Sequence, residues 1–308
     1  METRKLGPSG LEVSLVGLGT NQFGGRLDLE ASRTVIHKAL DLGVTHFDTA
    51  DIYGNSGGSE TIIGEVLGDR RVQVTLATKF GKRMAGSSEE HRGSRAYVLS
   101  AVEASLKRLK TDRVDLLWMH EPDPSTPMEE TFRALEELVK AGKVRHVGAS
   151  NFDAAQLVDA AASAKAVGVE GFVAAQDEYS LLHRAHETGP FPAMQTLGLS
   201  LVPYFPLSGG ALSGKYRKDK SFPAGTRLTE ESRFVRPHWD TIERLAAFAE
   251  ARGHTLLELA MSWLACKPLT ASIIAGATRP EQVEANAAAV GWKLTEEEMA
   301  EVDRLTAA

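Results

Sequence analysis

Four side chains that can move protons or carry charge follow three successive apolar runs of the sequence. The run that begins at Val44 reads VTHFDTADIYG and delivers Asp48 and Tyr53. The next run, VTLATKF, ends near Lys79, and the run VDLLWMH ends at His120. Short apolar runs bounded by glycine are typical of buried strands that pass into loops. We therefore expect an acid, a phenol, an ammonium and an imidazole at the ends of neighbouring strands.

This set of groups suits the protonation of an oxygen atom as it becomes an alkoxide. A phenol has an unperturbed pKa of ~10. A nearby ammonium favours the phenolate, so we expect Lys79 to lower the pKa of Tyr53. Asp48 would keep Lys79 charged and oriented, and His120 could hydrogen-bond a carbonyl oxygen. No metal is required, but no side chain supplies a hydride, so this chemistry implies a nicotinamide cofactor.

Each of the four residues also has a structural interpretation. Lys79 and Asp48 could form a buried ion pair, His120 could be a hydrogen-bonded core imidazole, and Tyr53 could pack in a loop. Lys79 could alternatively form a Schiff base, as in a barrel aldolase, which would need no nucleotide site. The alternation of side chains along strands favours the proton-transfer interpretation, because it brings the acid, the ammonium and the imidazole to the same end of the barrel.

The elements that would hold these groups follow a regular order along the chain. A β-hairpin is expected from Arg4 to Val13. Strands are expected at residues 16–18, 46–48, 74–79, 115–120, 144–149, 172–176, 201–205 and 272–274. Helices are expected at about 29–42, 59–67, 95–109, 127–141, 154–166, 239–252, 256–265, 281–290 and 296–305. Eight strands alternating with helices predict an α/β fold, a (β/α)8 TIM barrel.

We expect this barrel, with its N-terminal β-hairpin and extra C-terminal helices, to be a single domain over residues 1–308. A doubly wound sheet is the structural alternative, but GLGTNQ at Gly17 lacks the third glycine of the usual nucleotide motif.

One helix start, at Thr126 and Glu129, has the spacing of a capping box with proline at the first helical position, and Gly142 would end that helix.

Composition and charge exclude several classes of protein. A net charge of -6 and the absence of a basic run argue against nucleic-acid binding. The single cysteine, Cys266, cannot form an internal disulfide, which is typical of a reducing cytoplasm. The N-terminal METRKLGPSG has no apolar core of a signal peptide, and no apolar stretch reaches the ~18 residues of a membrane span. We therefore expect a cytoplasmic protein without membrane or nucleic-acid partners.

Three further features are weaker indications of function. The segment GGALSGKY has the spacing of a P-loop up to Lys215, but Tyr216 stands where a magnesium-binding hydroxyl is needed. ATP hydrolysis is not expected, while a backbone cradle for another phosphate stays open. His183 and His186 lack a neighbouring carboxylate or thiolate cluster, so we expect surface residues, not metal ligands. Cys266 is expected to pack in the core.

Several motifs together resemble the aldo-keto reductase superfamily over nearly the whole chain. They are DTADIYG, ATKF, LLWMH, GASNF, AAQDEYSLL, PYFPLSGGALSGKY and AGATRPEQVEAN, in the family's order and spacing. The resemblance implies a barrel that binds an extended nicotinamide dinucleotide without a Rossmann domain. It implies Asp48, Tyr53, Lys79 and His120 as a catalytic tetrad, with Tyr53 as the general acid.

The resemblance also implies where the cofactor lies. Ser150, Asn151 and Gln176 would contact the carboxamide, and Tyr204 would stack on the nicotinamide ring. The remaining implied contacts are Gly19, Thr20, Asn21, Asp48, Phe205, Pro206, Leu207, Ser208, Gly210, Lys215, Gly276, Thr278, Arg279, Gln282 and Asn286. The loop from 207 to 215 offers bare backbone N–H groups for a pyrophosphate.

A preference for NADPH over NADH is expected from the last motif. Thr278 and Glu281 have capping-box spacing, and a helix start with Arg279 beside it suits an extra phosphate on the adenosine ribose. Some family branches carry a lysine in place of Gly276, so one cationic contact is absent here. Substrate-pocket walls are expected from Phe23, Trp118 and residues 234–239, although barrel-top packing would explain them equally well.

Two hypotheses about function remain beside the aldolase. The first is an NADPH-dependent reductase of a small aldehyde or ketone. The second is a cofactor-binding regulatory subunit with little turnover, because the β-subunits of voltage-gated potassium channels resemble the same family. The sequence leaves open the substrate, the oligomeric state and the direction of the reaction.

Overall fold

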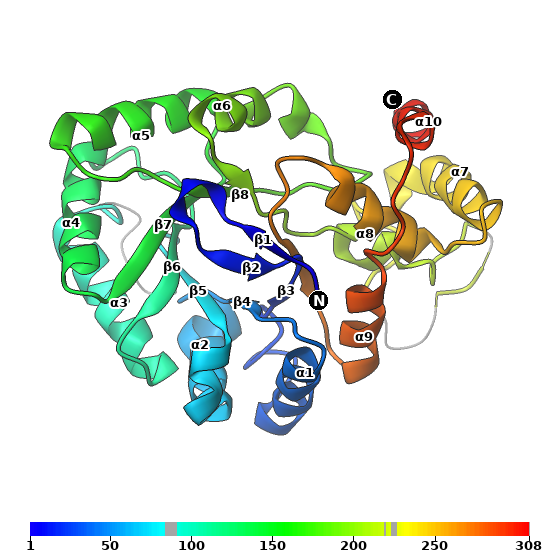
Figure 1. Cartoon of the computed structure of the whole chain (residues 1–308). Helices are drawn as coiled ribbons and strands as arrows, with labels where there is room; N and C mark the ends of the chain where they lie inside the picture. Colours follow the sequence, from blue (N-terminus) through cyan, green and yellow to red (C-terminus); the bar gives the residue numbers. More distant parts are fainter. Residues whose placement is uncertain (84–90, 219, 223–226, 308) are drawn as a thin grey trace.

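The computed structural model of the chain describes every residue except 84–90, 219, 223–226 and 308. Its main sheet has eight parallel strands in the order β10-β3-β4-β5-β6-β7-β8-β9. Helices surround this curled sheet on the outside (Figure 1). The predicted (β/α)8 architecture is confirmed.

The strands of this sheet are β3 (Val16–Gly19), β4 (His46–Asp48), β5 (Thr75–Phe80), β6 (Val114–Met119), β7 (Val144–Ser150), β8 (Ala174–Gln176), β9 (Ser200–Leu201) and β10 (Ile273–Gly276). A separate antiparallel pair consists of β1 (Thr3–Lys5) and β2 (Glu12–Ser14). The α-helices are α1 (Leu29–Asp41), α2 (Tyr53–Leu67), α3 (Arg95–Leu109), α4 (Met128–Lys140), α5 (Ala154–Val167), α6 (Pro190–Leu197), α7 (Trp239–Glu250), α8 (Leu256–Cys266), α9 (Pro280–Ala288) and α10 (Glu296–Thr306). Short 3-10 helices are η1 (Gly7–Ser9), η2 (Gly68–Gln73), η3 (Ala185–Glu187), η4 (Ser208–Ser213) and η5 (Arg236–His238).

Hydrogen bonds between β9 and the segment before β10 close the ring. The main-chain N–H of Leu201 donates to the carbonyl oxygen of Leu269 at 2.7 Å. The N–H of Ala271 donates to the carbonyl oxygen of Leu201 at 2.9 Å. The strand expected at 201–205 is too long, because β9 ends at Leu201. Beyond Leu201 the chain stays hydrogen-bonded to its neighbours. The carbonyl oxygen of Pro203 accepts from the N–H of Ile274 at 2.9 Å, and Tyr204 forms isolated bridges with Glu178 and Ile274.

The barrel interior is filled by large apolar side chains below the carboxyl ends of the strands. Trp118 of β6 is fully buried against Gly148 of β7. A Cβ added to Gly148 would lie 2.4 Å from the indole, so only glycine leaves room for this ring. Leu6 and Val13 of the hairpin join the same apolar cluster, and Figure 1 shows the hairpin lying across one end of the barrel. The predicted hairpin is confirmed, and chemistry is left to the opposite end.

Side-chain caps start several helices. Asp153, Thr255 and Thr295 form capping boxes at the starts of α5, α8 and α10, each with a Gln or Glu three residues later. These boxes satisfy main-chain N–H groups that the helices themselves leave without partners. They also fix where each helix meets the preceding loop.

The two capping boxes expected from sequence are wrong. The hydroxyl of Thr126 donates to Asp123 Oδ2 at 2.8 Å, and α4 begins without a side-chain cap. At α9, the main-chain N–H and the hydroxyl of Thr278 donate to Gln282 Oε1 at 2.8 and 3.1 Å. The N-cap position of α9 is Arg279, which makes no capping bond. In both cases a competing acceptor nearby has taken the hydroxyl.

Other elements differ from expectation in smaller ways. Helix α6 was not predicted, because Pro190 and Pro192 obscure its pattern, although proline is well placed in a first helical turn. The strand expected from residue 172 begins at Ala174. The helix expected at 59–67 is the regular part of α2, which is preceded by left-handed residues from Gly54 to Gly57. No helix in the described part of the chain is long and apolar enough to span a bilayer.

Candidate active site

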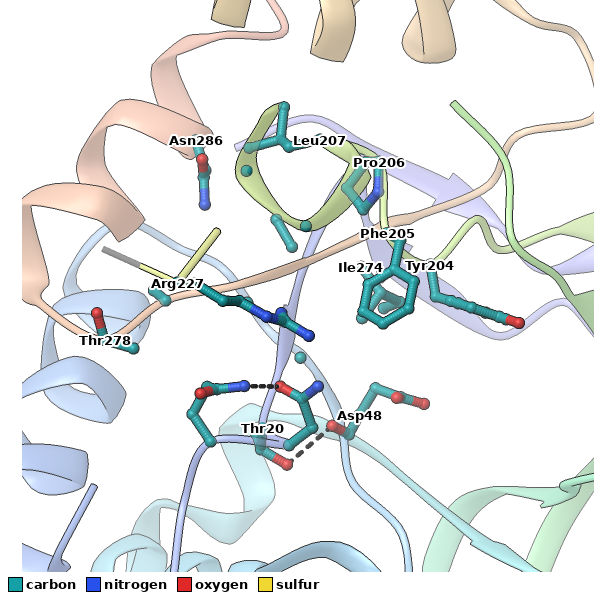
Figure 2. Close-up of a pocket in the computed structure, with 18 of the residues that line it drawn as sticks. Thr20, Asp48, Tyr204, Phe205, Pro206, Leu207, Arg227, Ile274, Thr278 and Asn286 are labelled. Atoms are coloured by element: carbon teal, nitrogen blue, oxygen red, sulfur yellow. Dashed lines mark hydrogen bonds between the residues drawn. The ribbon is translucent and has the colours of Figure 1, made fainter. Parts of the chain in front are cut away.

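A cavity of about 1040 Å³ opens at the carboxyl ends of the barrel strands. Its wall includes the last residues of five strands, namely Gly19 of β3, Asp48 of β4, Ser150 of β7, Gln176 of β8 and Gly276 of β10. It extends as far as Asn286 on α9. Figure 2 shows residues from these separate segments facing one space. The cavity therefore lies where a parallel barrel carries its chemistry.

Lys79 is the centre of a hydrogen-bonded cluster at this cavity. Its Nζ donates to Asp48 Oδ2 at 2.5 Å, to the carbonyl oxygen of Thr49 at 2.8 Å and to the hydroxyl oxygen of Tyr53 at 3.4 Å. All three ammonium protons thus have acceptors, and the side chain is only 1% exposed. The ring of His120 meets the ring of Tyr53 edge-on, with centroids 6.0 Å apart. The structure brings the four predicted residues together.

Burial and charge set the protonation of this cluster. Burial raises the pKa of Tyr53 above its usual 10.0, and the opposing effect of Lys79 does not reverse it. The expected net lowering of the Tyr53 pKa is therefore wrong. Burial would lower the pKa of Lys79, but Asp48 and Tyr53 raise it overall. Burial, then Lys79 and Lys82, hold the pKa of His120 well below 6.5. At neutral pH the cluster therefore contains a neutral phenol, a charged ammonium and a neutral imidazole.

Gln176 connects this cluster to the neighbouring strand. Its Nε2 donates to Asp48 Oδ1 at 2.9 Å, so both carboxylate oxygens of Asp48 accept hydrogen bonds. The carbonyl oxygen of Gln176 accepts from Ser150 Oγ at 2.8 Å and from the N–H of Asn151 at 3.3 Å. The three residues expected at the cofactor carboxamide therefore form one network with Asp48.

Asp177 holds Asn151 from below the cavity. Its Oδ1 accepts from the N–H of Asn151 at 3.0 Å, and its Oδ2 has no partner among the described residues. Asn151 donates from Nδ2 to the carbonyl oxygen of His120 at 2.9 Å and accepts from the hydroxyl of Tyr204 at 2.8 Å. Burial raises the pKa of Asp177 to about 7, although the Asn151 N–H opposes this. Asp177 thus orders Asn151, which in turn contacts His120 and Tyr204.

The segment after β9 lines the cavity with a tight turn. Phe205, Ser208, Gly209 and Gly210 all have left-handed φ values, between 46° and 111°. Gly209 and Gly210 lie in the cavity wall, and the ring of Phe234 packs against Gly209. Ser208 is buried instead, with its hydroxyl hydrogen-bonded to Ser180 Oγ at 2.8 Å. The N–H groups of Ser208 and Gly210 donate to the carbonyl oxygens of Phe205 and Leu207, each at 2.8 Å, and so hold the shape of this turn.

Cations complete this part of the wall. Arg227 projects into the cavity (Figure 2), with its guanidinium 5.5 Å from the centroid of the Phe205 ring. Lys215 and Arg279 also line the cavity. A glycine turn followed by several cations along one cavity wall is a setting that suits a ligand with several phosphates.

The predicted site residues can now be placed one by one. Those that line the cavity are Gly19, Thr20, Asn21, Asp48, Tyr53, His120, Ser150, Asn151, Gln176, Tyr204, Phe205, Pro206, Leu207, Gly210, Lys215, Gly276, Thr278, Arg279, Gln282 and Asn286. Lys79 lies behind Asp48 and Tyr53, and the side chain of Ser208 points to Ser180. The expected apolar walls Phe23 and Trp118 are wrong, because both side chains are fully buried in the core.

Three residues of interest were not singled out from the sequence. Arg227 lies in a polar segment rich in Lys and Arg, where spacing alone does not mark one of them. Lys82 follows Lys79 closely and lines the cavity beside His120. Asp177 follows Gln176 directly, so its place at a strand end was the available signal.

The weaker features of the sequence also have definite places. Among the described residues, no group of three His, Cys, Asp or Glu side chains could hold a metal ion. His183 and His186 face each other with ring centroids 5.5 Å apart. Cys266, at the end of α8, is partly exposed, so the expected packing in the core is only partly realised.

Comparison with known proteins gives the same classification as the fold and the cavity. The Aldo/keto reductase family matches residues 15–307. The chain is 37% identical over 307 residues to uncharacterized oxidoreductase YrpG of Bacillus subtilis (strain 168), covering 96% of this chain and 93% of that protein. It is 35% identical to a probable voltage-gated potassium channel subunit beta of Arabidopsis thaliana, covering 94% and 91%.

A third relative has a named substrate. The chain is 32% identical over 321 residues to L-glyceraldehyde 3-phosphate reductase of Escherichia coli (strain K12), covering 99% of this chain and 92% of that protein. The chain therefore belongs to the aldo/keto reductase family. The expected enzyme class, an oxidoreductase of the aldo-keto reductase type, is confirmed.

Proposed function

We propose that this protein uses NADPH to reduce an aldehyde or ketone to the alcohol, with Tyr53 as the general acid. The observation that carries the proposal is the position of Lys79 Nζ, which contacts both Asp48 Oδ2 and the Tyr53 hydroxyl at the wall of an extended cavity. When bound, the reduced nicotinamide supplies the hydride. The side chains supply the proton and the environment for the developing negative charge.

Each group has a role that follows from its protonation. Tyr53 is protonated at neutral pH, so it can donate a proton to the substrate oxygen. The charged Lys79 stabilises the phenolate that remains after donation, and Asp48 keeps Lys79 charged. The neutral His120 can donate an N–H hydrogen bond to the carbonyl oxygen and so stabilise negative charge there.

The cavity wall supports the same proposal on the cofactor side. Ser150, Asn151 and Gln176 would hold the carboxamide, and Tyr204 the nicotinamide ring. The pyrophosphate would lie along the turn at Gly210. The remaining contacts would come from Lys215, Arg227 and the start of α9, where Arg279 favours NADPH over NADH. We also propose that one barrel domain in the cytoplasm carries this activity.

Two alternatives are less well supported. A regulatory subunit is suggested by the relative named as a potassium channel subunit beta, but such a protein would not need the hydrogen-bonded arrangement of Lys79 and Tyr53. A Schiff-base aldolase needs a neutral lysine. Lys79 is 1% exposed and paired with Asp48, and this pairing raises its pKa, so it is a poor nucleophile.

The test is the oxidation of NADPH against a panel of aldehydes and ketones, with wild type and Tyr53→Phe in parallel. Loss of a positioned general acid is expected to lower kcat by ~10²-fold or more. Tyr97→Phe is the matched control, because Tyr97 lies on α3 outside the cavity wall. Tight NADPH binding without turnover in wild type would support the regulatory subunit instead. Failure to bind NADPH would remove the cofactor assignment.

A further inference from the structure

The cations of the cavity lie on two sides of the barrel. Lys215, Arg227, Arg233 and Arg279 belong to the segments after β9 and β10, where the cofactor phosphates are proposed to bind, and Arg26 follows β3, the neighbour of β10. Lys82 follows β5. In the ring order, β3 and β4 separate β5 from β10, and β6, β7 and β8 separate it from β9. Lys82 is therefore on the side of the mouth away from the proposed phosphate cradle.

Lys82 has an unusual environment for a lysine in a cavity wall. It lines the cavity together with Ile52, Tyr53 and His120, and its side chain is partly exposed. Within the described part of the chain it forms no ion pair and no hydrogen bond. The nearby Arg92, in contrast, is paired with Glu121 at 3.2 Å. A charged donor thus lines the cavity without an acceptor among the residues that the structure describes.

The position of Lys82 relative to the reacting groups is also informative. Its charge acts on His120 together with that of Lys79, and Lys82, Tyr53 and His120 line the same cavity. A compound with its carbonyl between Tyr53 and His120 would therefore share this cavity with the ammonium. An anionic group on that compound would then meet a cation that pairs with no carboxylate of the described residues.

We propose that Lys82 recognises an anionic substituent, a carboxylate or a phosphate, on the carbonyl substrate. This inference rests on the proposed function and narrows it to anionic aldehydes or ketones. Lys82 would act as a specificity residue: its ammonium attracts the charged end of the substrate and helps to orient the carbonyl toward Tyr53. The attraction is electrostatic and partly exposed, so added salt should weaken it.

The experiment compares pairs of aldehydes, each with one anionic and one neutral member. One pair is 4-carboxybenzaldehyde and 4-nitrobenzaldehyde, and the other is glyceraldehyde 3-phosphate and glyceraldehyde. The readout is the ratio of kcat/KM for the anionic and the neutral member of each pair, so losses common to both cancel. The enzymes are wild type, Lys82→Met, Lys82→Arg and Lys5→Met. Lys5 is an exposed residue of β1 at the opposite end of the barrel, so Lys5→Met is the matched control.

Lys82→Met is expected to lower the ratio by about 10-fold or more, the factor that a hydrogen bond to a charged group contributes. Lys82→Arg should keep most of the ratio, and Lys5→Met all of it. Added potassium chloride should lower the ratio in wild type but not in Lys82→Met. A loss confined to one pair identifies whether a carboxylate or a phosphate is recognised.

Several results would overturn this inference. An equal ratio in wild type and Lys82→Met would exclude recognition of an anion by Lys82. A rise in the Kd for NADPH in Lys82→Met, of the same size as the fall in the ratio, would make Lys82 a cofactor contact instead. If wild type reduces the neutral aldehydes in a Tyr53-dependent way and the ratio does not change, only this inference fails. If wild type reduces neither member of either pair, nor any carbonyl of the wider panel, the proposed function itself fails.

Discussion

Replacing Asp177 by asparagine tests how a buried carboxylate supports the site. Asp177 is 1% exposed, and only its Oδ1 has a partner among the described residues, the N–H of Asn151 at 3.0 Å. Asparagine has nearly the same shape, keeps an oxygen for that N–H and cannot ionise. Asp177→Asn should therefore preserve the position of Asn151 while removing the cost of a buried charge.

The size of the effect follows from the two pKa values of Asp177. Its pKa is about 7 in the folded protein and ~3.9 in an unfolded chain. Between these values the folded state binds the additional proton, so rising pH destabilises the wild type through this group by ~1.4 kcal/mol per pH unit. The accumulated effect is at most about 4 kcal/mol, and it is complete above pH ~7. Asparagine removes this pH dependence.

The assay is urea denaturation of wild type and Asp177→Asn from about pH 5 to pH 8. The stability of the variant relative to wild type should increase with pH and level off above about pH 7. Asp159→Asn changes an exposed carboxylate of α5 and is the matched control. NADPH affinity should be kept in Asp177→Asn and lost in Asp177→Ala, which removes the acceptor for Asn151. A stability difference that is constant or falls with rising pH would refute this reasoning.

The remaining predictions concern the ion pair and the cofactor. Lys79→Met should destabilise the fold by about 3 kcal/mol or more, because it leaves a buried carboxylate at Asp48 with Gln176 as its remaining side-chain donor. Adding Asp48→Asn should recover part of this loss in urea denaturation, and strict additivity of the two changes would contradict a coupled pair. Arg279→Gln should raise the Kd for NADPH by about 10-fold or more, with little change for NADH, because it removes a charged phosphate contact. Equal weakening for both cofactors in a fluorescence titration would show that Arg279 does not contact the extra phosphate.

The fold and the cluster around Lys79 could be predicted because strand ends are local features. Apolar runs such as VTLATKF mark both the strand and the residue that emerges from it. Parallel pairing then brings Asp48, Lys79 and His120 to the same end without any knowledge of distant contacts. The interior packing is less accessible to sequence, since Trp118 reads equally well as a cavity wall or as a core residue. Its burial depends on Gly148 of the neighbouring strand.

Features that depend on competition between neighbours could not be predicted. Thr126 fits a capping box in sequence, yet Asp123 takes its hydroxyl in the folded chain. The pKa of Tyr53 was expected to fall because Lys79 is near. Burial, which no local pattern reveals, raises it instead. Arg227 belongs to a long polar segment, and only the tertiary structure shows that it reaches the cavity.

The strained backbone of the cavity suggests that the site is formed before any ligand binds. Asn151, Phe205 and Ser208 have left-handed φ values of 61°, 51° and 46°, a conformation that costs residues such as Phe and Ser about 1–2 kcal/mol and that Asn adopts more readily. Each persists only if the surrounding structure fixes it. Asn151 is fixed by bonds from its backbone and from its side chain, and one of these runs to the carboxylate of Asp177. The ionised Asp177 thus destabilises the fold at neutral pH and orders the proposed carboxamide site, so removing its charge while keeping its oxygen should separate the two effects.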